Sequence, residues 1–590
     1  MSSDYSDIRV VVGLDFGTTF SVCFKFYYIH VLIEDLSELT PKFLQGFTYC
    51  HMNDEKNLVT NVQWVGAIGE LKTNTALQYD ENYVKIESWG HPALSKRPKK
   101  KKENKTRPAE LFKLHLGKLA DNLKPELPVD YKKAIIDYLH EIGKLIKDEV
   151  MSAWCGIDFF ENVFVIMTVP AEYLEKDKEI MRECAYKARL IKEKESKNLQ
   201  FTTEPEAAAI YCMENSLKIY DLDIPGTTFM IVDCGGGTVD LTTRKVLKDR
   251  QLGEVTERAG DYCGSTFIDR EFIKVLRKIL GDRAIDLLRD KHYGQMQYMV
   301  QEFCRNAKMI FTGEESEFIS YEMDIEEVVP VIMKCVTEEV EEKMKDNDWV
   351  IEFKYNDIKS LFDPVVDRII KLIQIQLDNT RDKCSAMFLV GGFSQSKYLQ
   401  KRIKQKFGQR IKNISVPALP MAAISRGATL YGLSMKNSEP NSDNKDLHKF
   451  VINERVLKYT YGIRISPLWK EGDPIERKRS NGRIRKFRYM ARRGTKVKVD
   501  QEFTIKQSPV SPEQDSIKFV IYYTTKYDAK YCDEDGMEKL GSLSISLPDA
   551  QLGIDGPIEF GLTFGRMEIT ATAKNSVNGQ NYHATLTLDI

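Results

Sequence analysis

The sequence predicts an α/β protein of two lobes, followed by an all-β sandwich domain. From residue 8 to about residue 435, strands of buried character alternate with segments whose apolar residues follow helical spacing, the pattern of an α/β architecture. Two of these strands, ending at Asp15 and Asp233, run into the same kind of glycine- and threonine-containing turn, and this repetition predicts duplicated lobes. Beyond residue 456, short alternating segments separated by glycine and proline predict the sandwich.

Length and composition restrict the classes of protein. At 590 residues the chain is too long for one hydrophobic core, so about three or four compact units are expected. The 86 basic and 87 acidic side chains nearly cancel, and the net charge points to neither nucleic acid nor membrane as a partner. No apolar run reaches the length of a membrane span, and the polar start, Met1–Asp7, does not resemble a secretory signal. The 11 cysteines lack CxxC pairs, which favours a reducing compartment, and we expect the cytoplasm.

The elements of the first domain, residues 1–435, follow from apolar spacing. Strands are predicted at 8–14, 162–169, 227–232, 238–246 and 386–390, and helices at 130–152, 172–190, 262–280 and 362–377. The repeated turns place the two lobes at about residues 1–215 and 216–435.

A basic stretch, KRPKKKKENKTR, runs from Lys96 to Arg107. It has no apolar periodicity and contains Pro98, so our first interpretation is a solvated loop. Lysine-rich runs also serve nuclear import and polyanion binding, so the Lys99–Lys102 run leaves a nuclear location open.

A polar linker is predicted at residues 436–455, and the sandwich domain at 456–590. The linker begins KNSEPNSDNKDLHK, which is polar and contains proline. Strands of the last domain are predicted at 497–505, 517–525, 543–547, 567–573 and 582–590.

Three segments share one pattern, a buried strand followed by small and polar residues. They read VVVGLDFGTTFS (Val10–Ser21), MIVDCGGGTVDL (Met230–Leu241) and MFLVGGFS (Met387–Ser394). Glycine lets a backbone approach a polyphosphate closely, and Gly17, Gly235, Gly236 and Gly237 provide this freedom. The hydroxyls of Thr18, Thr19 and Thr238 add donors to phosphate oxygens. Since Mg²⁺ prefers oxygen ligands and keeps several waters, Asp15 and Asp233 suit the role of holding those waters.

A single glycine cluster is usually only a turn. Two Asp–x–Gly turns that each close an apolar strand and each carry threonine are a much more specific signal. They predict two half-sites, one in each lobe, that close on one nucleotide.

Both turns resemble the phosphate turns of the actin, sugar-kinase and 70-kilodalton heat-shock superfamily, and the GGGTVD version resembles the heat-shock branch. Three further segments support this resemblance: TVPAEY (Thr168–Tyr173), TEPEAAAIYC (Thr203–Cys212) and LVGGFSQSKYLQ (Leu389–Gln400). The family's divergent twelfth-member branch has stretches similar to ELFKLHLG (Glu110–Gly117), AGDYCGSTFIDREF (Ala259–Phe272) and FDPVVDRIIKLI (Phe362–Ile373). The resemblance spans nearly the whole chain and implies an actin-like ATPase domain built from duplicated ribonuclease-H-like lobes.

The resemblance also implies roles for individual residues. Asp15 and Asp233 would hold Mg²⁺ through water, and Glu204 and Asp240 would orient the attacking water. Contacts to ATP or ADP would come from the glycine turns and their neighbours: Gly17, Thr18, Thr19, Gly235, Gly236, Gly237, Thr238, Gly264, Gly391 and Gly392. Phosphoryl transfer of this kind relies on positioning and charge neutralisation.

Each of these residues also has a purely structural interpretation. The threonines Thr19 and Thr238 suit helix caps or turns. Glu204 suits the first turn of a helix, where a carboxylate is favourable, and Asp240 suits a hydrogen-bonded residue at the start of a strand.

The chain departs from the family pattern in two places. No segment clearly matches the one that carries the family's lysine beside the γ-phosphate; Lys113 is the best candidate, and a solvated helix lysine is the alternative. On the adenine side, Gln395 and Met309 replace family arginines, while Lys308 is kept. Glutamine cannot stack on a base as arginine does, so Phe393 is the candidate for that contact.

The C-terminal domain resembles a diverged heat-shock substrate-binding sandwich, best at residues 556–588. Such sandwiches hold an extended peptide by backbone hydrogen bonds and an apolar pocket. No helical lid is predicted after it. Charges interrupt the apolar residues of the segment that precedes Tyr459, which weakens the expected coupling between domains.

The favoured function is an ATP-binding, weakly ATP-hydrolysing chaperone-like protein whose partners are polypeptide clients, with a co-chaperone or exchange factor as a further partner class. An alternative is a nucleotide-binding scaffold or sensor with little hydrolysis and one dedicated protein partner. A metabolite kinase is a third reading, which the β-rich tail does not favour. Fold alone does not choose among these.

Overall fold

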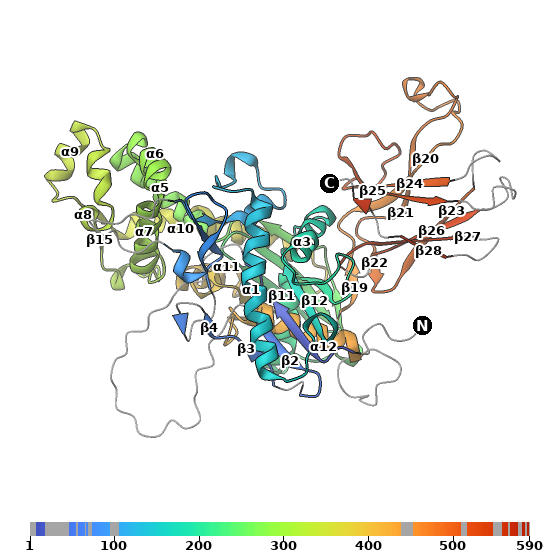
Figure 1. The fold of residues 1–590 in the computed structure, drawn as a ribbon, viewed down its shortest axis with the longest axis horizontal. Coiled ribbons are helices and arrows are strands. Elements are labelled where there is room, and N and C mark those ends of the chain that lie inside the picture. Colours follow the sequence, from blue (N-terminus) through green and yellow to red (C-terminus); the bar gives the residue numbers. More distant parts are fainter. Residues whose placement is uncertain are drawn as a thin grey trace.

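The computed structural model describes residues 7–17, 47–54, 57–64, 67–68, 73–94, 106–437, 452–508, 516–546, 557–564, 567–575, 581–584 and 587–588. Thr18, Thr19 and the Lys99–Lys102 run, all named above, lie outside these described residues. A large α/β body is followed by a smaller β-rich region, which lies at the right of Figure 1. The predicted mixed α/β class is confirmed.

The sheet of the first lobe has the strand order β10-β9-β1-β2-β3. Its strands are β1 (Val10–Leu14), β2 (Phe47–His51), β3 (Val59–Thr60), β9 (Val163–Val169) and β10 (Leu199–Thr203). The central strand β1 pairs antiparallel with β2 and parallel with β9. All five residues of β1 are buried, as expected for a strand covered on both faces.

The sheet of the second lobe repeats this topology in the order β18-β17-β11-β12-β13. Its strands are β11 (Thr228–Cys234), β12 (Val239–Val246), β13 (Leu252–Glu254), β17 (Cys384–Val390) and β18 (Asn413–Ser415). The central strand β11 pairs antiparallel with β12 and parallel with β17, just as β1 pairs with β2 and β9. The two lobes are therefore built on the same plan.

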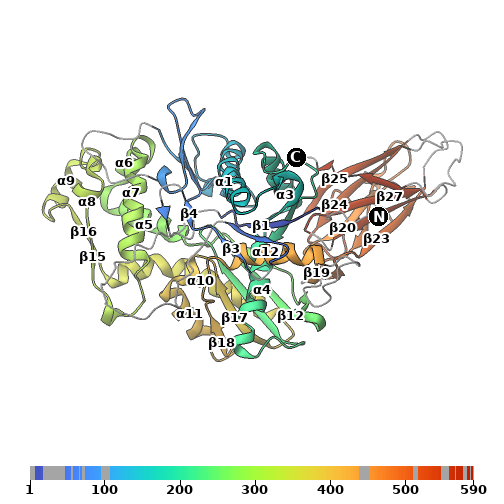
Figure 2. The ribbon, with the colours of Figure 1, turned by 60° about the horizontal axis from the view of Figure 1, so that its bottom comes forward.

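Two helices, α4 (Glu204–Asn215) and α12 (Ala423–Asn437), lie between the two sheets (Figure 2). They cross closely: a Cβ placed on Gly427 would overlap the backbone of Ala207, so only glycine fits there. By sequence position α12 was assigned to the second lobe, but it packs against β1, β2 and β9 of the first. The reason is that its apolar face completes the core on the side of β1 that carries Val11.

The remaining helices lie outside the two central ones. In the first lobe these are α1 (Tyr131–Ala153), α2 (Phe159–Asn162) and α3 (Glu175–Lys187). In the second lobe they are α5 (Thr266–Leu280), α6 (Asp282–Lys291), α7 (Tyr293–Phe303), α8 (Ile325–Val328), α9 (Glu338–Lys345), α10 (Tyr355–Asp378) and α11 (Lys397–Phe407). Of these, α6, α7, α8 and α9 gather with β15 (Tyr321–Asp324) at the left of Figure 1, away from the sheet of the second lobe. Helix α10 begins earlier than the predicted 362–377 because Asp357 accepts a hydrogen bond from the Lys354 backbone and caps it.

Short strands complete the α/β body: β4 (Gln63–Trp64), β5 (Ala67–Ile68), β6 (Ala76–Tyr79), β7 (Ile86–Trp89), β8 (Ala109–Glu110), β14 (Ala259–Asp261), β15 (Tyr321–Asp324) and β16 (Val350–Phe353). Of these, β14 pairs with the start of β12 and so lies beside the second glycine turn.

The described end of the predicted linker is a strand. β19 (Ile452–Val456) pairs parallel with β13, and β22 (Lys496–Lys498) pairs antiparallel with β19. The sheet of the second lobe thus continues into the chain that follows it. The prediction of a linker at 436–455 therefore does not hold for residues 452–455, because β13 offers an unpaired edge that this segment completes.

The region after β19 contains two antiparallel sheets. One holds β20 (Thr460–Ile465), β21 (Lys486–Ala491), β24 (Ser516–Thr524), β25 (Met537–Ser546) and β29 (Thr587–Leu588); the other holds β23 (Glu502–Gln507), β26 (Ile558–Thr563), β27 (Thr570–Asn575) and β28 (Asn581–Ala584). Their facing residues share one core, in which the rings of Phe519 and Phe560 stack with centroids 4.4 Å apart. The strand predicted at 497–505 is divided between β22 and β23, because β22 pairs with β19.

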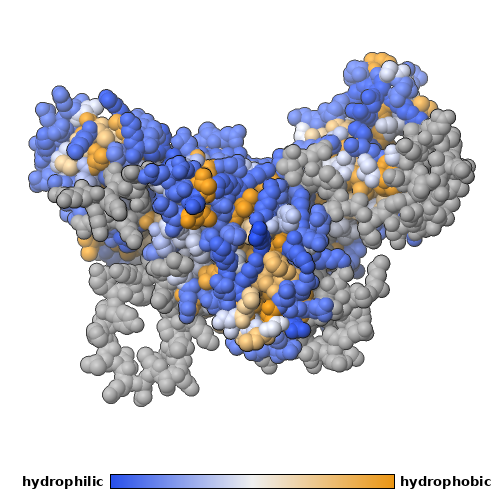
Figure 3. Space-filling model, viewed as in Figure 1, coloured by the Kyte–Doolittle hydropathy of each residue, from blue (hydrophilic) through white to orange (hydrophobic). Residues whose placement is uncertain are grey.

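The face drawn in Figure 3 is mainly hydrophilic, with smaller apolar groups between. Single large apolar side chains are exposed, among them Ile319 at 85% and Ile219 at 74%, which is normal for protein surfaces. Within the described residues, no helix combines the length and the hydropathy that crossing a membrane requires.

Candidate functional site

The first glycine turn begins where β1 ends. Asp15 is buried, and its Oδ1 accepts a hydrogen bond from the Thr168 hydroxyl, 3.3 Å away at the end of β9. The Gly17 carbonyl accepts a hydrogen bond from the Thr75 hydroxyl at 2.9 Å. Parallel strands bring their carboxyl ends to the same edge of a sheet, and ligands of α/β folds bind at that edge. The structure places Asp15 there.

Lys113 lies at the same edge, in a short 3₁₀ turn, Phe112–His115. Its ammonium group is 2.9 Å from Glu204 Oε1 and donates a hydrogen bond to the Phe16 carbonyl. The residue is only 2% exposed, so the structural alternative of a solvated lysine is wrong. Lys113 therefore places a buried positive charge between the first turn and the start of α4.

The second glycine turn, Gly235–Gly237, is fixed by the start of α5. Each of its three carbonyls accepts a backbone hydrogen bond from the segment Gly264–Thr266, at 2.9 to 3.2 Å. A Cβ on Gly264 would overlap the backbone of Gly236 and Gly237, so this contact requires glycine. In the described part of the chain, the N–H groups of Gly236 and Gly237 donate to no protein acceptor. Such N–H groups are suited to an anion.

Asp233 and Asp240 face each other across β11 and β12. They are direct partners in the antiparallel register, so their side chains lie on the same face of the sheet. Both are buried, with 3% and 1% exposure. The turn with Thr238 between them is thus bordered by two carboxylates.

Asp240 joins the two lobes. Its Oδ1 accepts a hydrogen bond from the backbone N–H of Ala171, 2.9 Å away in the first lobe. Burial and the nearby carboxylates of Glu204 and Glu172 raise the pKa of Asp240 to about 8. A carboxylate of the first lobe and one of the second therefore lie close enough to repel each other in the same cleft.

The third glycine segment follows β17. Gly391 has a φ of 81°, and a Cβ there would overlap the Asp233 carboxylate, so glycine is required. Gly392 has open space around its Cα. Phe393 is in the core of the second lobe and 6% exposed, which leaves little of its ring for stacking on a base.

Lys308 lies on the same side of the second lobe, in a single π-helical turn, Cys304–Lys308. Its ammonium group is 2.7 Å from both Asp269 Oδ1 and the Ser265 carbonyl. Lys308 therefore stabilises the N-terminus of α5. The residues at this N-terminus donate the hydrogen bonds that fix the second glycine turn.

A second set of contacts, which we call the Glu110 latch, joins the two lobes. The Glu110 carboxylate of the first lobe accepts hydrogen bonds from the Tyr293 hydroxyl and, at 2.7 Å, from the Gln297 amide of the second. Arg107 lies over the Tyr293 ring, 4.3 Å from its centroid. Burial raises the pKa of Glu110, although both hydrogen bonds favour the ionised form.

The donor set suits a hydrated divalent cation. Four buried carboxylates, Asp15, Glu204, Asp233 and Asp240, lie beside the glycine turns or beside Lys113, and Lys113 is the cation that contacts Glu204. Among the described residues no cluster of three or more histidine, cysteine or acidic side chains could hold a metal ion directly. A magnesium ion that keeps most of its waters needs only one or two carboxylates.

A buried ion cluster that the sequence did not predict surrounds Glu206 and Glu254. Glu206, two residues after Glu204, is 2.9 Å from Arg244 and 2.9 Å from Arg455. Glu254 is 3.2 Å from Arg244 and 3.4 Å from Arg258, and Arg258 is 3.7 Å from Glu206. Although burial opposes ionisation, the three guanidinium groups hold the pKa of Glu206 well below its usual range. The second glutamate of the TEPE segment was the available signal, since a buried acid at that position needs a cation.

Comparison with models of known protein families finds no match. Among curated proteins, the chain is 24% identical to heat shock 70 kDa protein 12A of Mus musculus over 503 residues, covering 72% of this chain and 70% of that protein. It is 23% identical to heat shock 70 kDa protein 12B of Homo sapiens over 502 residues, covering 72% and 70%. These relatives confirm the predicted resemblance to the twelfth-member branch of the 70-kilodalton heat-shock family.

Among solved structures, the chain is similar to MreB 5 of Spiroplasma citri bound to AMPPNP. The TM-score is 0.43 at 13% identity, covering 73% of this chain and 98% of that one.

Proposed function

We propose that this protein binds ATP in the cleft between its two lobes and hydrolyses it slowly, as a chaperone-like ATPase. The observation that carries the proposal is the meeting of the Lys113–Glu204 pair of the first lobe with Asp240 of the second, beside two glycine turns. An anion-binding backbone, a buried lysine and water-orienting carboxylates are the parts that phosphoryl transfer to water needs.

The roles of the residues follow from their positions. The N–H groups of Gly236 and Gly237 and the hydroxyl of Thr238 would bind phosphate oxygens. Lys113, oriented by Glu204, would offset the charge that develops on the γ-phosphate. Asp240 and Glu204 would accept hydrogen bonds from the attacking water and orient it.

A magnesium ion would be held through its waters by Asp15 and Asp233, and when bound it supplies positive charge beside the phosphates. That positive charge would lower the pKa of Asp240 from the raised value it has beside Glu204 and Glu172. Asp240 would then be ionised at neutral pH and able to take a proton from water at its carboxylate.

For the β-rich region we propose binding of extended polypeptide. Its two antiparallel sheets share an apolar core, and sheets of this kind hold peptides by backbone pairing and apolar pockets. The likeness to the heat shock 70 kDa proteins 12A and 12B supports this choice over a metabolite kinase. The partner class is therefore polypeptide, with a co-chaperone or exchange factor as a second class.

Single-turnover hydrolysis of ATP, with and without an unfolded polypeptide, tests the proposal. The wild type should release phosphate, and Asp15→Asn and Glu204→Gln should each slow release by about 10²–10³-fold. Lys118→Gln, at an exposed lysine that contacts Glu538, is the matched control and should leave the rate unchanged. Equal rates in all four proteins would refute the catalytic assignment.

A scaffold or sensor with little hydrolysis is the second candidate. It is favoured by the base side of the cleft, where Phe393 is buried and Lys308 is engaged with Asp269, so few contacts remain for adenine. Calorimetry and the hydrolysis assay together separate the two candidates. Equal affinities for Mg-ATP and Mg-GTP, combined with undetectable hydrolysis, would favour the scaffold.

A further inference from the structure

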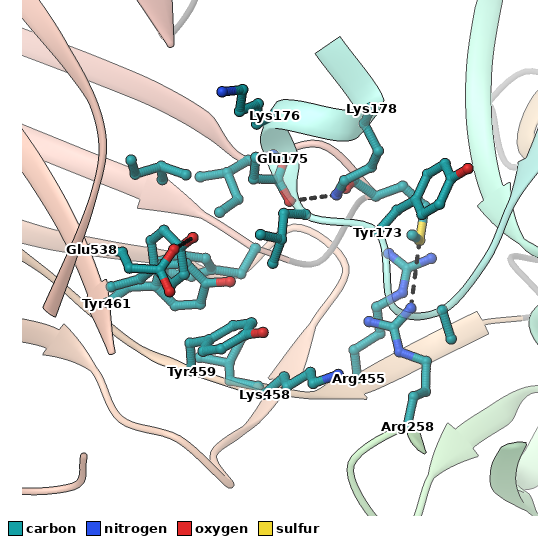
Figure 4. Close-up of a pocket in the computed structure, with 18 of the residues that line it drawn as sticks. Tyr173, Glu175, Lys176, Lys178, Arg258, Arg455, Lys458, Tyr459, Tyr461 and Glu538 are labelled. Carbon is teal, nitrogen blue, oxygen red and sulfur yellow. Dashed lines mark hydrogen bonds and ion pairs between the residues drawn. The ribbon is translucent and has the colours of Figure 1, made fainter. Parts of the chain in front are cut away.

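A cavity lies between the α/β body and the β-rich region, and it adjoins the candidate site at Ala171, whose N–H donates to Asp240. Its volume is about 410 Å³, within the range of roughly 300–1,000 Å³ that is common for small-molecule sites. The first lobe contributes residues of the segment 171–178 and Thr203, the second contributes Arg258, and the remaining wall comes from 455–461 and the β-rich region. Figure 4 shows Tyr459 and Tyr461 at one end of this cavity, and Tyr173 with Arg258 and Arg455 at the other.

One end of the cavity is aromatic. Tyr459, Tyr461, Tyr523 and Phe564 all line it. Their rings contact each other, with centroids 4.8 Å apart for Tyr461 and Phe564 and 5.1 Å for Tyr459 and Tyr523. Such rings present flat apolar faces, which favour a planar or aromatic ligand.

The other end carries guanidinium groups. Arg258 and Arg455 line the cavity and belong to the buried ion cluster described above. Among the arginines of this cluster Arg258 is the most accessible, with 17% of its side chain exposed against 3% for Arg455 and none for Arg244. An anionic ligand in the cavity can therefore reach the Arg258 guanidinium group.

Arg258 is the member best placed to receive that anion. Its two contacts with carboxylates, at 3.4 and 3.7 Å, are the longest in the cluster, and its Nη1 donates to the Met567 sulfur at 3.8 Å. Sulfur is a weak acceptor. A carboxylate would offer the guanidinium two strong, parallel hydrogen bonds instead.

The other charged groups around the cavity are paired or exposed to solvent, and Lys176 and Lys539 of its lining belong to the exposed ones. Lys178 pairs with Glu175, and Lys458 pairs with Glu172 at 2.7 Å. Glu538 accepts a hydrogen bond from the Tyr523 hydroxyl and lies 3.4 Å from Lys118. The anion preference therefore comes from the arginine end.

We propose that this interdomain cavity binds a small aromatic carboxylate, with the ring against the tyrosines and the carboxylate on Arg258. The proposal does not rest on ATP hydrolysis, and its carboxylate contact, Arg258, lies outside the glycine turns. Because both domains contribute to its walls, an occupant would favour their docked arrangement.

Isothermal titration calorimetry with 1-naphthaleneacetate and its neutral isostere 1-naphthaleneacetamide tests the proposal on the full-length protein. One molecule of naphthaleneacetate should bind, about tenfold more tightly than naphthaleneacetamide. The reason is that the carboxylate forms a charge-assisted bidentate contact with Arg258, whereas the amide forms a neutral one. Arg258→Gln should remove this tenfold preference, and Arg258→Lys should keep part of it. Met567→Trp, which fills the cavity, should weaken both probes, and Arg493→Gln, at an arginine outside the lining, should weaken neither.

The affinity for naphthaleneacetate should be the same when the titration is repeated in saturating Mg-ATP, and the same in Asp15→Asn as in the wild type. Competition by Mg-ATP would place the probe in the nucleotide cleft and overturn the proposal. Equal affinity for naphthaleneacetate and naphthaleneacetamide, or no binding of either probe, would also overturn the proposal. So would a preference for naphthaleneacetate that persists in Arg258→Gln when circular dichroism shows that the variant is folded normally.

Discussion

The guanidinium group of Arg455 lies against the carboxylate of Glu206, with Nε 2.9 Å from Oε1 and Nη2 3.3 Å from Oε2. Arg455 belongs to β19, the strand that leads out of the α/β body, and Glu206 belongs to the first turn of α4. The same turn carries Glu204, which holds Lys113 in the cleft. One helical turn thus contacts both the candidate phosphate site and the strand that leads to the β-rich region.

Removing Glu206 should destabilise the protein more than removing Arg455. Glu206→Gln leaves three guanidinium groups and only one carboxylate, Glu254. Arg455→Gln leaves two guanidinium groups and two carboxylates. We expect a loss of about 3–5 kcal/mol in the free energy of unfolding for Glu206→Gln. For Arg455→Gln we expect about 1–3 kcal/mol. Urea unfolding measures both values.

The control for this comparison is Arg493→Gln. Arg493 pairs with Glu257 at 2.7 Å, but its side chain is 44% exposed, so we expect a change of at most about 1 kcal/mol. Equal losses for Glu206→Gln and Arg455→Gln would contradict the charge count.

Lys113→Gln should slow hydrolysis by about 10²–10³-fold and also reduce stability. The amide cannot offset charge on a phosphate, and Glu204 would lose its buried cation. Single-turnover phosphate release and thermal unfolding measure the two effects, with Lys118→Gln as the exposed counterpart. Normal hydrolysis in Lys113→Gln would exclude the assigned role.

Glu110 should make stability fall as pH rises. Its pKa in the folded protein is raised above the usual 4.5, so the folded state keeps a proton that the unfolded chain has lost. The destabilisation is absent below the unfolded pKa, grows above it, and becomes constant once pH exceeds the raised pKa. Glu110→Gln has no such proton, so its stability relative to the wild type should increase as pH rises above the usual pKa of 4.5.

Unfolding free energies at several pH values check this sign. Glu126→Gln serves as the control, because Glu126 is 72% exposed where it faces Arg107. A difference between Glu110→Gln and the wild type that stays constant with pH would show that Glu110 is ionised in the latch.

Gly264→Ala should weaken nucleotide binding at least about tenfold. The added methyl group would overlap the backbone of Gly236 and Gly237 and displace the phosphate-facing turn. Gly143→Ala is the control: it lies within α1, where the new Cβ meets only Leu190 at 3.4 Å, and helix propensity favours alanine by about 0.5–1 kcal/mol. Calorimetry with Mg-ADP measures both variants. Unchanged affinity in Gly264→Ala would separate this turn from the nucleotide.

Five strands of the α/β body, β1, β9, β11, β12 and β17, were predictable because burial on both faces gives long apolar runs. The predicted strand at 162–169 matches β9, and the predicted helix at 130–152 matches α1 within a residue at each end. The position of α12 was not predictable, since its apolar pattern does not say which sheet it covers. The division of 497–505 into β22 and β23 depends on pairing with β19, which no local pattern reveals.

The candidate site was predictable where glycines and acids follow strands in sequence. Asp233 and Asp240 were both singled out, and their pairing across two strands explains why one turn carries both. The ion cluster was not predictable, because Arg244, Arg258 and Arg455 are scattered along the chain and look like ordinary surface residues until the fold buries them.

The continuation of the second lobe's sheet through β19 and β22 affects how the protein can be divided for experiments. A fragment that stops at residue 437 would expose the N–H and C=O groups along β13, next to the apolar side chains of Leu252 and Val246. Bare strand edges of this kind recruit other chains, so such a fragment should self-associate on expression. Extending it through Lys498 would restore β19 on that edge and β22 beside β19, so self-association through β13 should be lost.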